Sequence, residues 1–133
     1  MKRLLNGILL IVICFSSYIN AKQPPELYII SPLDGATVSE MVTVQFGLKG
    51  MGVSPAGLDK ENTGHHHLLI DGKKLPMMDT PMGSEVSHFG GGQTETTIHL
   101  SKGKHTLQLV LGDFQHIPHD PAIVSKSITI TVE

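Results

Sequence analysis

The most regular feature of the chain is an alternation of apolar and polar residues. Within 42–48 every second residue is apolar, and the residues between are polar or small. A period of two predicts a β-strand with one buried face, here 41–48. The same alternation, or a short apolar run between turn residues, predicts further strands at 27–30, 65–71, 94–100, 105–112 and 124–132.

Turn residues separate these segments. The dipeptide Asp71-Gly72 predicts a tight turn, after which residues 73–75 begin a return strand. The run SKGK at 101–104 predicts a second turn. Segments 94–100 and 105–112 are therefore expected to be neighbouring strands of a meander.

No window of the chain shows the periodicity of a helix. About seven short strands in one domain of this length predict an all-β fold, an antiparallel immunoglobulin-like sandwich. A small closed barrel is the alternative, because alternation alone does not say whether two sheets pack or one sheet closes.

The first residues have the layout of a secretory signal peptide. Lys2 and Arg3 form a basic start, residues 8–15 are an unbroken apolar run, and Ala21 is a small residue suited to cleavage. A membrane anchor is the alternative, but the run is shorter than the roughly 20 residues that span a bilayer. A lipid anchor on Cys14 is disfavoured because Ile13 stands where lipidation signals have a small residue.

We therefore expect a signal peptide at 1–21 and a single β-sandwich domain at 22–133, periplasmic or secreted, with no membrane span after cleavage. Cleavage would leave 8 basic and 12 acidic residues, a net charge of −4 with neutral histidines. Because phosphate binding needs a basic surface, nucleic acid is not an expected partner. Cys14 is the only cysteine, so the mature domain would have no disulfide and no thiolate ligand.

Histidine is the unusual component of this domain, with eight residues that all follow residue 64. Segments 49–64, 76–93 and 112–121 lack a strand pattern, and loops of this length in a small domain are usually functional or mobile. In an immunoglobulin-like sandwich all three loops open at one end. Six of the histidines lie in these loops or directly beside them: His65, His66, His67, His88, His116 and His119.

Strand geometry divides the three consecutive histidines. Side chains alternate along a strand, so His65 and His67 share one face while His66 points to the other. Either His66 alone or the pair can face a common site. We expect the metal ligands to be His65, His67, His116 and His119, with His66 and His88 as further candidates.

An exported, cysteine-free site rich in imidazole suits copper or zinc, and a thioether from Met51 or Met82 would favour copper. Asp113 and Asp120 are close enough in sequence to orient a ring by accepting its second N–H. Serines occur in the same loops, but no nucleophile-elbow pattern accompanies them, so no enzyme is expected. The predicted function is a metal-binding module that carries or buffers copper or zinc.

The alternative is a hydrogen-bond network of histidines that fixes the loops of a non-catalytic partner-binding or adhesion domain. The partner would then be a protein rather than a metal ion. Because imidazoles titrate near neutral pH, a pH-responsive surface is a third interpretation.

The segments GHHHLLID at 64–71, HFGGGQTE at 88–95 and HIPHDP at 116–121 resemble a family of small exported bacterial domains of unknown function. The resemblance extends from about Phe46 to the C-terminus. It implies an exported all-β module, and the family offers no established activity to transfer. In architecture alone, the expected fold is also similar to periplasmic copper carriers of the CopC type, which bind metal through histidine and methionine at the sheet ends. Similarity of fold says little about function.

Overall fold

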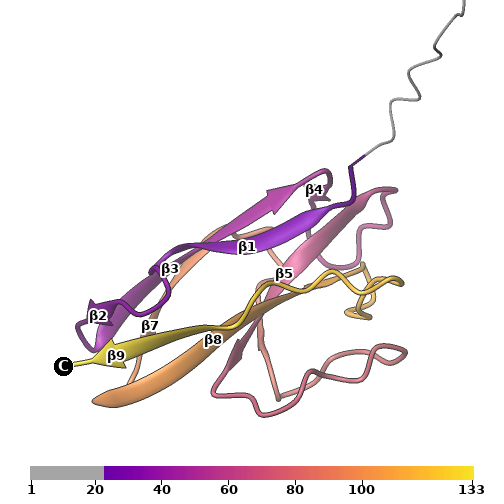
Figure 1. Cartoon of the computed structure of the whole chain (residues 1–133). Helices are drawn as coiled ribbons and strands as arrows, with labels where there is room; N and C mark the ends of the chain where they lie inside the picture. Colours follow the sequence, from indigo (N-terminus) through magenta and orange to yellow (C-terminus); the bar gives the residue numbers. More distant parts are fainter. Residues whose placement is uncertain (1–22) are drawn as a thin grey trace, which may run out of the picture.

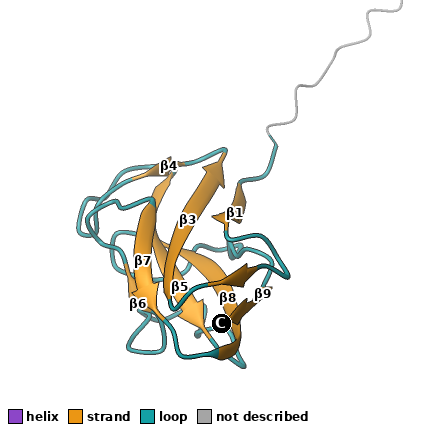
Figure 2. Ribbon diagram, turned by 90° about the vertical axis from the view of Figure 1, so that its left-hand side faces the viewer, coloured by secondary structure: helices purple, strands orange, loops and turns teal. Residues whose placement is uncertain are grey.

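The computed structural model describes residues 23–133, so the predicted signal peptide lies outside the described residues. Within this range the chain forms two β-sheets and no helix (Figures 1 and 2). The strands are β1 (Glu26–Ser31), β2 (Thr37–Val38), β3 (Met41–Lys49), β4 (Gly52–Val53), β5 (Thr63–Ile70), β6 (Ser87–His88), β7 (Glu95–His99), β8 (Gly103–Gly112) and β9 (Ile128–Val132). One sheet has the order β1-β3-β7, and the other has the order β2-β9-β8-β5-β4, with β6 also pairing with β5.

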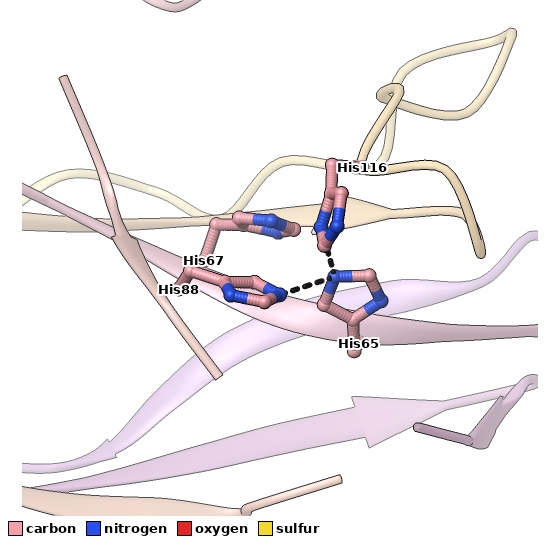
Figure 3. A group of neighbouring side chains, drawn as sticks. All are labelled: His65, His67, His88 and His116. Atoms are coloured by element: carbon pink, nitrogen blue, oxygen red, sulfur yellow. Dashed lines mark hydrogen bonds between the residues drawn. The ribbon is translucent and has the colours of Figure 1, made fainter. Parts of the chain in front are cut away.

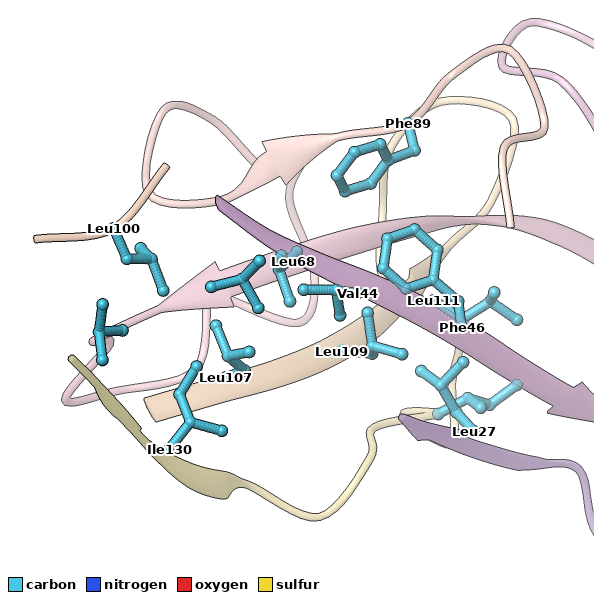
Figure 4. Close-up of a cluster of buried hydrophobic side chains, with 13 residues drawn as sticks. Leu27, Val44, Phe46, Leu68, Phe89, Leu100, Leu107, Leu109, Leu111 and Ile130 are labelled. Carbon is cyan, nitrogen blue, oxygen red and sulfur yellow. The ribbon is translucent and has the colours of Figure 1, made fainter. Parts of the chain in front are cut away.

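The hydrophobic core lies between the two sheets and is built from the alternating apolar positions of the long strands (Figure 4). On β3, Val42, Val44 and Phe46 are buried, and the polar residues between them are exposed. This is the pattern that removes one face of a strand from water. Fully or almost fully buried side chains include Leu27, Val44, Phe46, Leu68, Leu107, Leu109, Leu111 and Ile130.

The all-β sandwich predicted from the alternation is therefore confirmed. It is not wholly antiparallel, because β2 pairs in parallel with β9 and β4 in parallel with β5. The finer assignment to the immunoglobulin type stays a prediction. The described part of the chain contains no helix long and apolar enough to cross a membrane.

Two expected connections are wrong. Residues 73–75 form no return strand, since the chain leaves β5 at Asp71, where φ is 53°, and next pairs with that strand only at β6. The predicted meander is also absent, because β7 pairs with β3 in one sheet whereas β8 lies between β5 and β9 in the other. The SKGK turn thus carries the chain from one sheet to the other.

Strand β5 is buried on both faces, which is unusual for a strand that carries three histidines. Every residue from Gly64 to Leu69 is buried. One face contributes Leu68 to the core, and the other face carries His65 and His67. This second face holds the candidate site.

Candidate metal centre

The alternation of β5 separates the three consecutive histidines as predicted. His65 and His67 point to the face away from the core, and their ring centroids are 4.6 Å apart (Figure 3). His66 points to the core face, where its ring packs 5.0 Å from that of Phe46. Its Nδ1 also lies 3.1 Å from the carbonyl oxygen of Gln93. His66 is thus held by the core and does not join the other two.

His88 reaches the site through strand pairing. In the register of β5 with β6, His88 stands directly opposite His67. Residues opposite each other in neighbouring strands project from the same face, which places the two rings side by side. Their centroids are 5.2 Å apart and the rings are stacked. Gly90 allows this position, because a Cβ there would lie 2.4 Å from the Cε1 of His88.

His116 comes from a turn that follows β8. Its φ of 67° lies in the left-handed region, which residues with a Cβ adopt rarely. Asp113 holds the turn, because its Oδ1 accepts hydrogen bonds from the backbone N–H groups of Gln115 at 2.8 Å and Ile117 at 3.0 Å. The role expected for Asp113, orienting an imidazole directly, is therefore corrected: its carboxylate fixes the backbone that presents His116.

These three local arrangements bring four imidazoles together: His65, His67, His88 and His116. Each ring offers a nitrogen that lies within 4.8 Å of the nitrogens offered by the others. A tetrahedral ion bound at about 2.0 to 2.1 Å needs its nitrogen ligands about 3.3 Å apart. Two of the separations, 3.0 and 3.1 Å, are close to this value.

One nitrogen of His65 lies at the centre of the group. Its Nε2 is 3.0 Å from the Nδ1 of His116 and 3.1 Å from the Nε2 of His88 (Figure 3). A ring nitrogen of a neutral imidazole carries either one proton or one in-plane lone pair. It can therefore form one well-directed hydrogen bond. The Nε2 of His65 has two neighbouring ring nitrogens, so it can bond well to only one of them.

His67 lacks polar partners altogether. Its side chain is 1% exposed, and neither Nδ1 nor Nε2 has a hydrogen-bond partner among the described residues. A neutral imidazole always has one donor and one acceptor, and leaving such a group buried and unpaired costs about 1 to 3 kcal/mol. A network formed only to fix the loops would leave this cost uncompensated.

The site favours the neutral form of His65, His67 and His88, which is the form that binds metal. Burial, with the neighbouring rings of His88 and His116, lowers the pKa of His65 to about 4. Burial, with the rings of His65 and His88, lowers the pKa of His67 to about 3. Desolvation and the ring of His116 also lower the pKa of His88. Lone pairs therefore remain available at neutral pH.

The group is closed on one side and open on the other. His65 and His67 are buried, His116 is half-buried and His88 is exposed. An ion would reach the buried pair past His88.

Two of the six predicted ligands are not brought into this group. His66 lies on the opposite face of β5. His119 lies on the same face of β5 as His66. Its Nε2 is 2.8 Å from the position that a Cβ on Gly64 would take, and a side chain at position 64 would point to that face. The left-handed turn at His116 directs that residue to one face while His119 lies at the other, a separation that their spacing in sequence does not reveal.

The two remaining histidines, His99 and His105, are not part of the cluster. His99 is exposed on β7. The Nδ1 of His105 lies 2.7 Å from the Oδ2 of Asp71, and its Nε2 lies 2.8 Å from the carbonyl oxygen of Ser101. These contacts raise the pKa of His105, mainly through the hydrogen bond with Asp71.

Two glycines, which have no chemical signature in the sequence, make room for the rings. Gly112, on β8, pairs with His65 on β5. A Cβ on Gly112 would lie 2.6 Å from the Cε1 of His67. Gly90 has the same role for His88. The only signal in the sequence is glycine where a side chain is expected, and it becomes informative once the strand register is known.

Comparison with protein families gives one match. A family model described as "Domain of unknown function (DUF4399)" matches residues 44–133, which include all four clustered histidines. Comparison with curated proteins gives no match, and comparison with solved structures gives none either.

Proposed function

We propose that this chain, which belongs to the DUF4399 family, is an exported module that binds one metal ion through His65, His67, His88 and His116. The ion is copper or zinc, and the role is carriage or buffering. Export is inferred from the signal-peptide pattern of residues 1–21.

The observation that carries the proposal is the state of His67. Both of its ring nitrogens are buried without a partner, within reach of three other imidazoles. An ion between the four rings would give His67 a bond that no described protein group supplies. It would also replace the crowded contacts at the Nε2 of His65 by bonds directed to one centre.

The donor set narrows the choice of ion. The clustered ligands are imidazoles alone, with no carboxylate and no thiolate. Calcium and magnesium require oxygen ligands, whereas neutral imidazole suits copper and zinc. Copper is placed first because copper(II) stands above zinc in the affinity order of nitrogen ligands.

Storage or transfer fits this site better than catalysis. Catalytic zinc sites use three protein ligands and leave a position for water or substrate, whereas structural sites use four. On tetrahedral zinc, four imidazoles in one group would leave no such position. The exposure of His88 provides a route by which an ion can enter and leave.

Calorimetric titration of the chelator-stripped domain with copper(II) and with zinc tests the proposal. We expect one ion per chain, bound with a Kd below about 10 μM, corresponding to roughly 7 kcal/mol. The double variant His65→Leu/His116→Leu should lose this binding, and His99→Leu, on the exposed part of β7, should keep it. The proposal fails if the wild type binds neither ion or if the double variant binds as well as the wild type.

A purely structural network is the second candidate, and the two ring-to-ring contacts of His65 favour it. It would fix the three loops of a partner-binding surface without any ion. In that case histidine removal would lower the stability of the metal-free protein, and added metal would not change that stability.

A further inference from the structure

We propose that Met82 supplies a thioether ligand at the histidine site, with imidazoles of the cluster as the other ligands, and that the ion for which the site is selective is copper(I). This inference rests on the proposed metal binding and names the ion and oxidation state. It is carried by the placement of Met82 and by the charge of the ligand set.

Met82 is tied to a ligand residue through its backbone. Its N–H donates a hydrogen bond of 2.9 Å to the carbonyl oxygen of His116. The next residue is fixed as well, because the N–H of Gly83 lies 3.0 and 3.1 Å from the two carboxylate oxygens of Glu85. The backbone of Met82 is therefore attached to that of His116, and the contact between Gly83 and Glu85 adds order within the loop.

The side chain of Met82 points toward the rings. Its Cε lies 2.8 Å from the position that a Cβ on Gly112 would take, and the Cε1 of His67 lies 2.6 Å from the same point. The methyl end of Met82 and the edge of His67 therefore share the space that Gly112 leaves open. The sulfur is one bond from this methyl carbon.

Burial distinguishes Met82 from the two residues next to it and from Met77. Pro81 and Gly83 are exposed, whereas Met82 is half-buried. Met77, in the same loop, is 68% exposed. Met51, the other thioether considered from the sequence, packs against the core. Of the described methionines considered as ligands, Met82 is the one placed beside the imidazoles.

The charge of the ligand set favours a monovalent ion. Neutral imidazoles and a thioether bring no negative charge, so no ligand would neutralise the charge of the ion beside the buried groups. The cost of placing a charge in such surroundings rises with the square of the charge, which penalises zinc and copper(II) more than copper(I). Thioether sulfur is a soft ligand that selects copper(I) over harder ions.

Competition of the full mature domain with a copper(I)-specific chelator, under anaerobic conditions with excess reductant, tests the inference. Met82→Leu keeps the size and apolar character of the side chain and removes the sulfur. Met77→Leu is the matched control in the same loop. We expect Met82→Leu to weaken copper(I) binding at least about tenfold, to change copper(II) binding less than about threefold, and Met77→Leu to change neither.

X-ray absorption of the copper(I) form gives a second readout that packing alone would not affect. A sulfur neighbour of copper should be present in the wild type and in Met77→Leu and absent in Met82→Leu. The inference is overturned if copper(I) binding of Met82→Leu stays within about twofold of wild type, or if the wild-type spectrum shows nitrogen neighbours only. If the wild type still binds copper and zinc under these outcomes and a His67 variant does not, the proposed function stands without the inference. If the wild type binds no ion, both fail.

Discussion

The Nε2 of His65 lies 3.0 Å from the Nδ1 of His116, although 51 residues separate them in the sequence. His65 is on β5, and His116 is on the turn that follows β8. The same nitrogen of His65 also meets the Nε2 of His88 at 3.1 Å. Three segments that are distant in the chain thus present ring nitrogens to one point.

Replacing His67 by leucine should not destabilise the metal-free protein. The change removes two buried polar atoms without partners, and each such group costs about 1 to 3 kcal/mol. We expect the free energy of unfolding in urea, with a chelator present, to stay the same or to rise by about 1 kcal/mol. Leu68→Ala, on the core face of the same strand, should lower it by about 2 to 5 kcal/mol and so validates the assay.

A structural network makes the opposite prediction for His67→Leu. If the rings of the cluster hold the loops together, this variant should lose stability in the absence of metal. A loss of more than about 1 kcal/mol would therefore favour the network over the metal site.

The metal-free protein should lose stability as the pH falls below the ordinary pKa of histidine. The pKa values of His65 and His67 in the fold are lowered to about 4 and about 3. Below pH 6.5 the unfolded chain binds protons that these two buried residues do not, so unfolding is favoured increasingly until the pKa values of the fold are reached. Each of them contributes a slope of up to about 1.4 kcal/mol per pH unit.

Urea unfolding between pH 7 and pH 4 measures this slope. The double variant His65→Leu/His67→Leu should show a flatter profile than the wild type, because the two residues no longer take up protons on unfolding. Equal slopes in the two proteins would show that these histidines are not buried in the neutral form.

Asp113 should affect metal binding without touching the ion. Its carboxylate accepts the backbone N–H groups that hold the turn around His116. We expect Asp113→Ala to weaken metal binding about tenfold or more, as removal of residues that position metal ligands commonly does. Asp120→Ala, an exposed position in the same loop, should bind as the wild type does in the same titration. Equal affinities of the two variants would exclude a positioning role for Asp113.

The remote pair of His105 and Asp71 should titrate in the opposite direction. The hydrogen bond with Asp71 raises the pKa of His105 above its ordinary value of 6.5. Its stabilising contribution is therefore complete below pH 6.5 and is lost as the pH rises through the raised pKa. Because the pair is partly exposed, we expect this contribution to be on the order of 0.5 kcal/mol.

Following the ring protons of His105 by NMR as a function of pH gives this pKa directly. Asp71→Asn should return it toward 6.5. A pKa of His105 at or below 6.5 in the wild type would contradict the interaction.

The fold was largely predictable because period-two alternation is a local property. Val44 and Phe46 on β3, and Leu107 and Leu109 on β8, are buried as their spacing indicates. Which strands pair is a matter of long-range packing, and this is why the meander across the SKGK turn was wrong. The two-residue strands, such as β6, are too short to show any periodicity.

The candidate site was predictable to the extent that it depends on strand geometry. Alternation separates His66 from His65 and His67 without further information. Placing His88 requires its register with β5, and choosing between His116 and His119 requires the left-handed backbone at His116. Neither is visible in residue spacing, because both are set by contacts between segments distant in the sequence.

The central claim is that one metal ion occupies the space between the four clustered rings, and anomalous diffraction tests it most directly. Crystals of the mature domain loaded with one equivalent of copper would be measured at the copper absorption edge. We predict a single anomalous peak that contacts nitrogens of His65, His67, His88 and His116, with metal–nitrogen distances of about 2.0 to 2.1 Å. The absence of a peak between these rings, or a peak only at other histidines such as His99 or His105, would contradict the account.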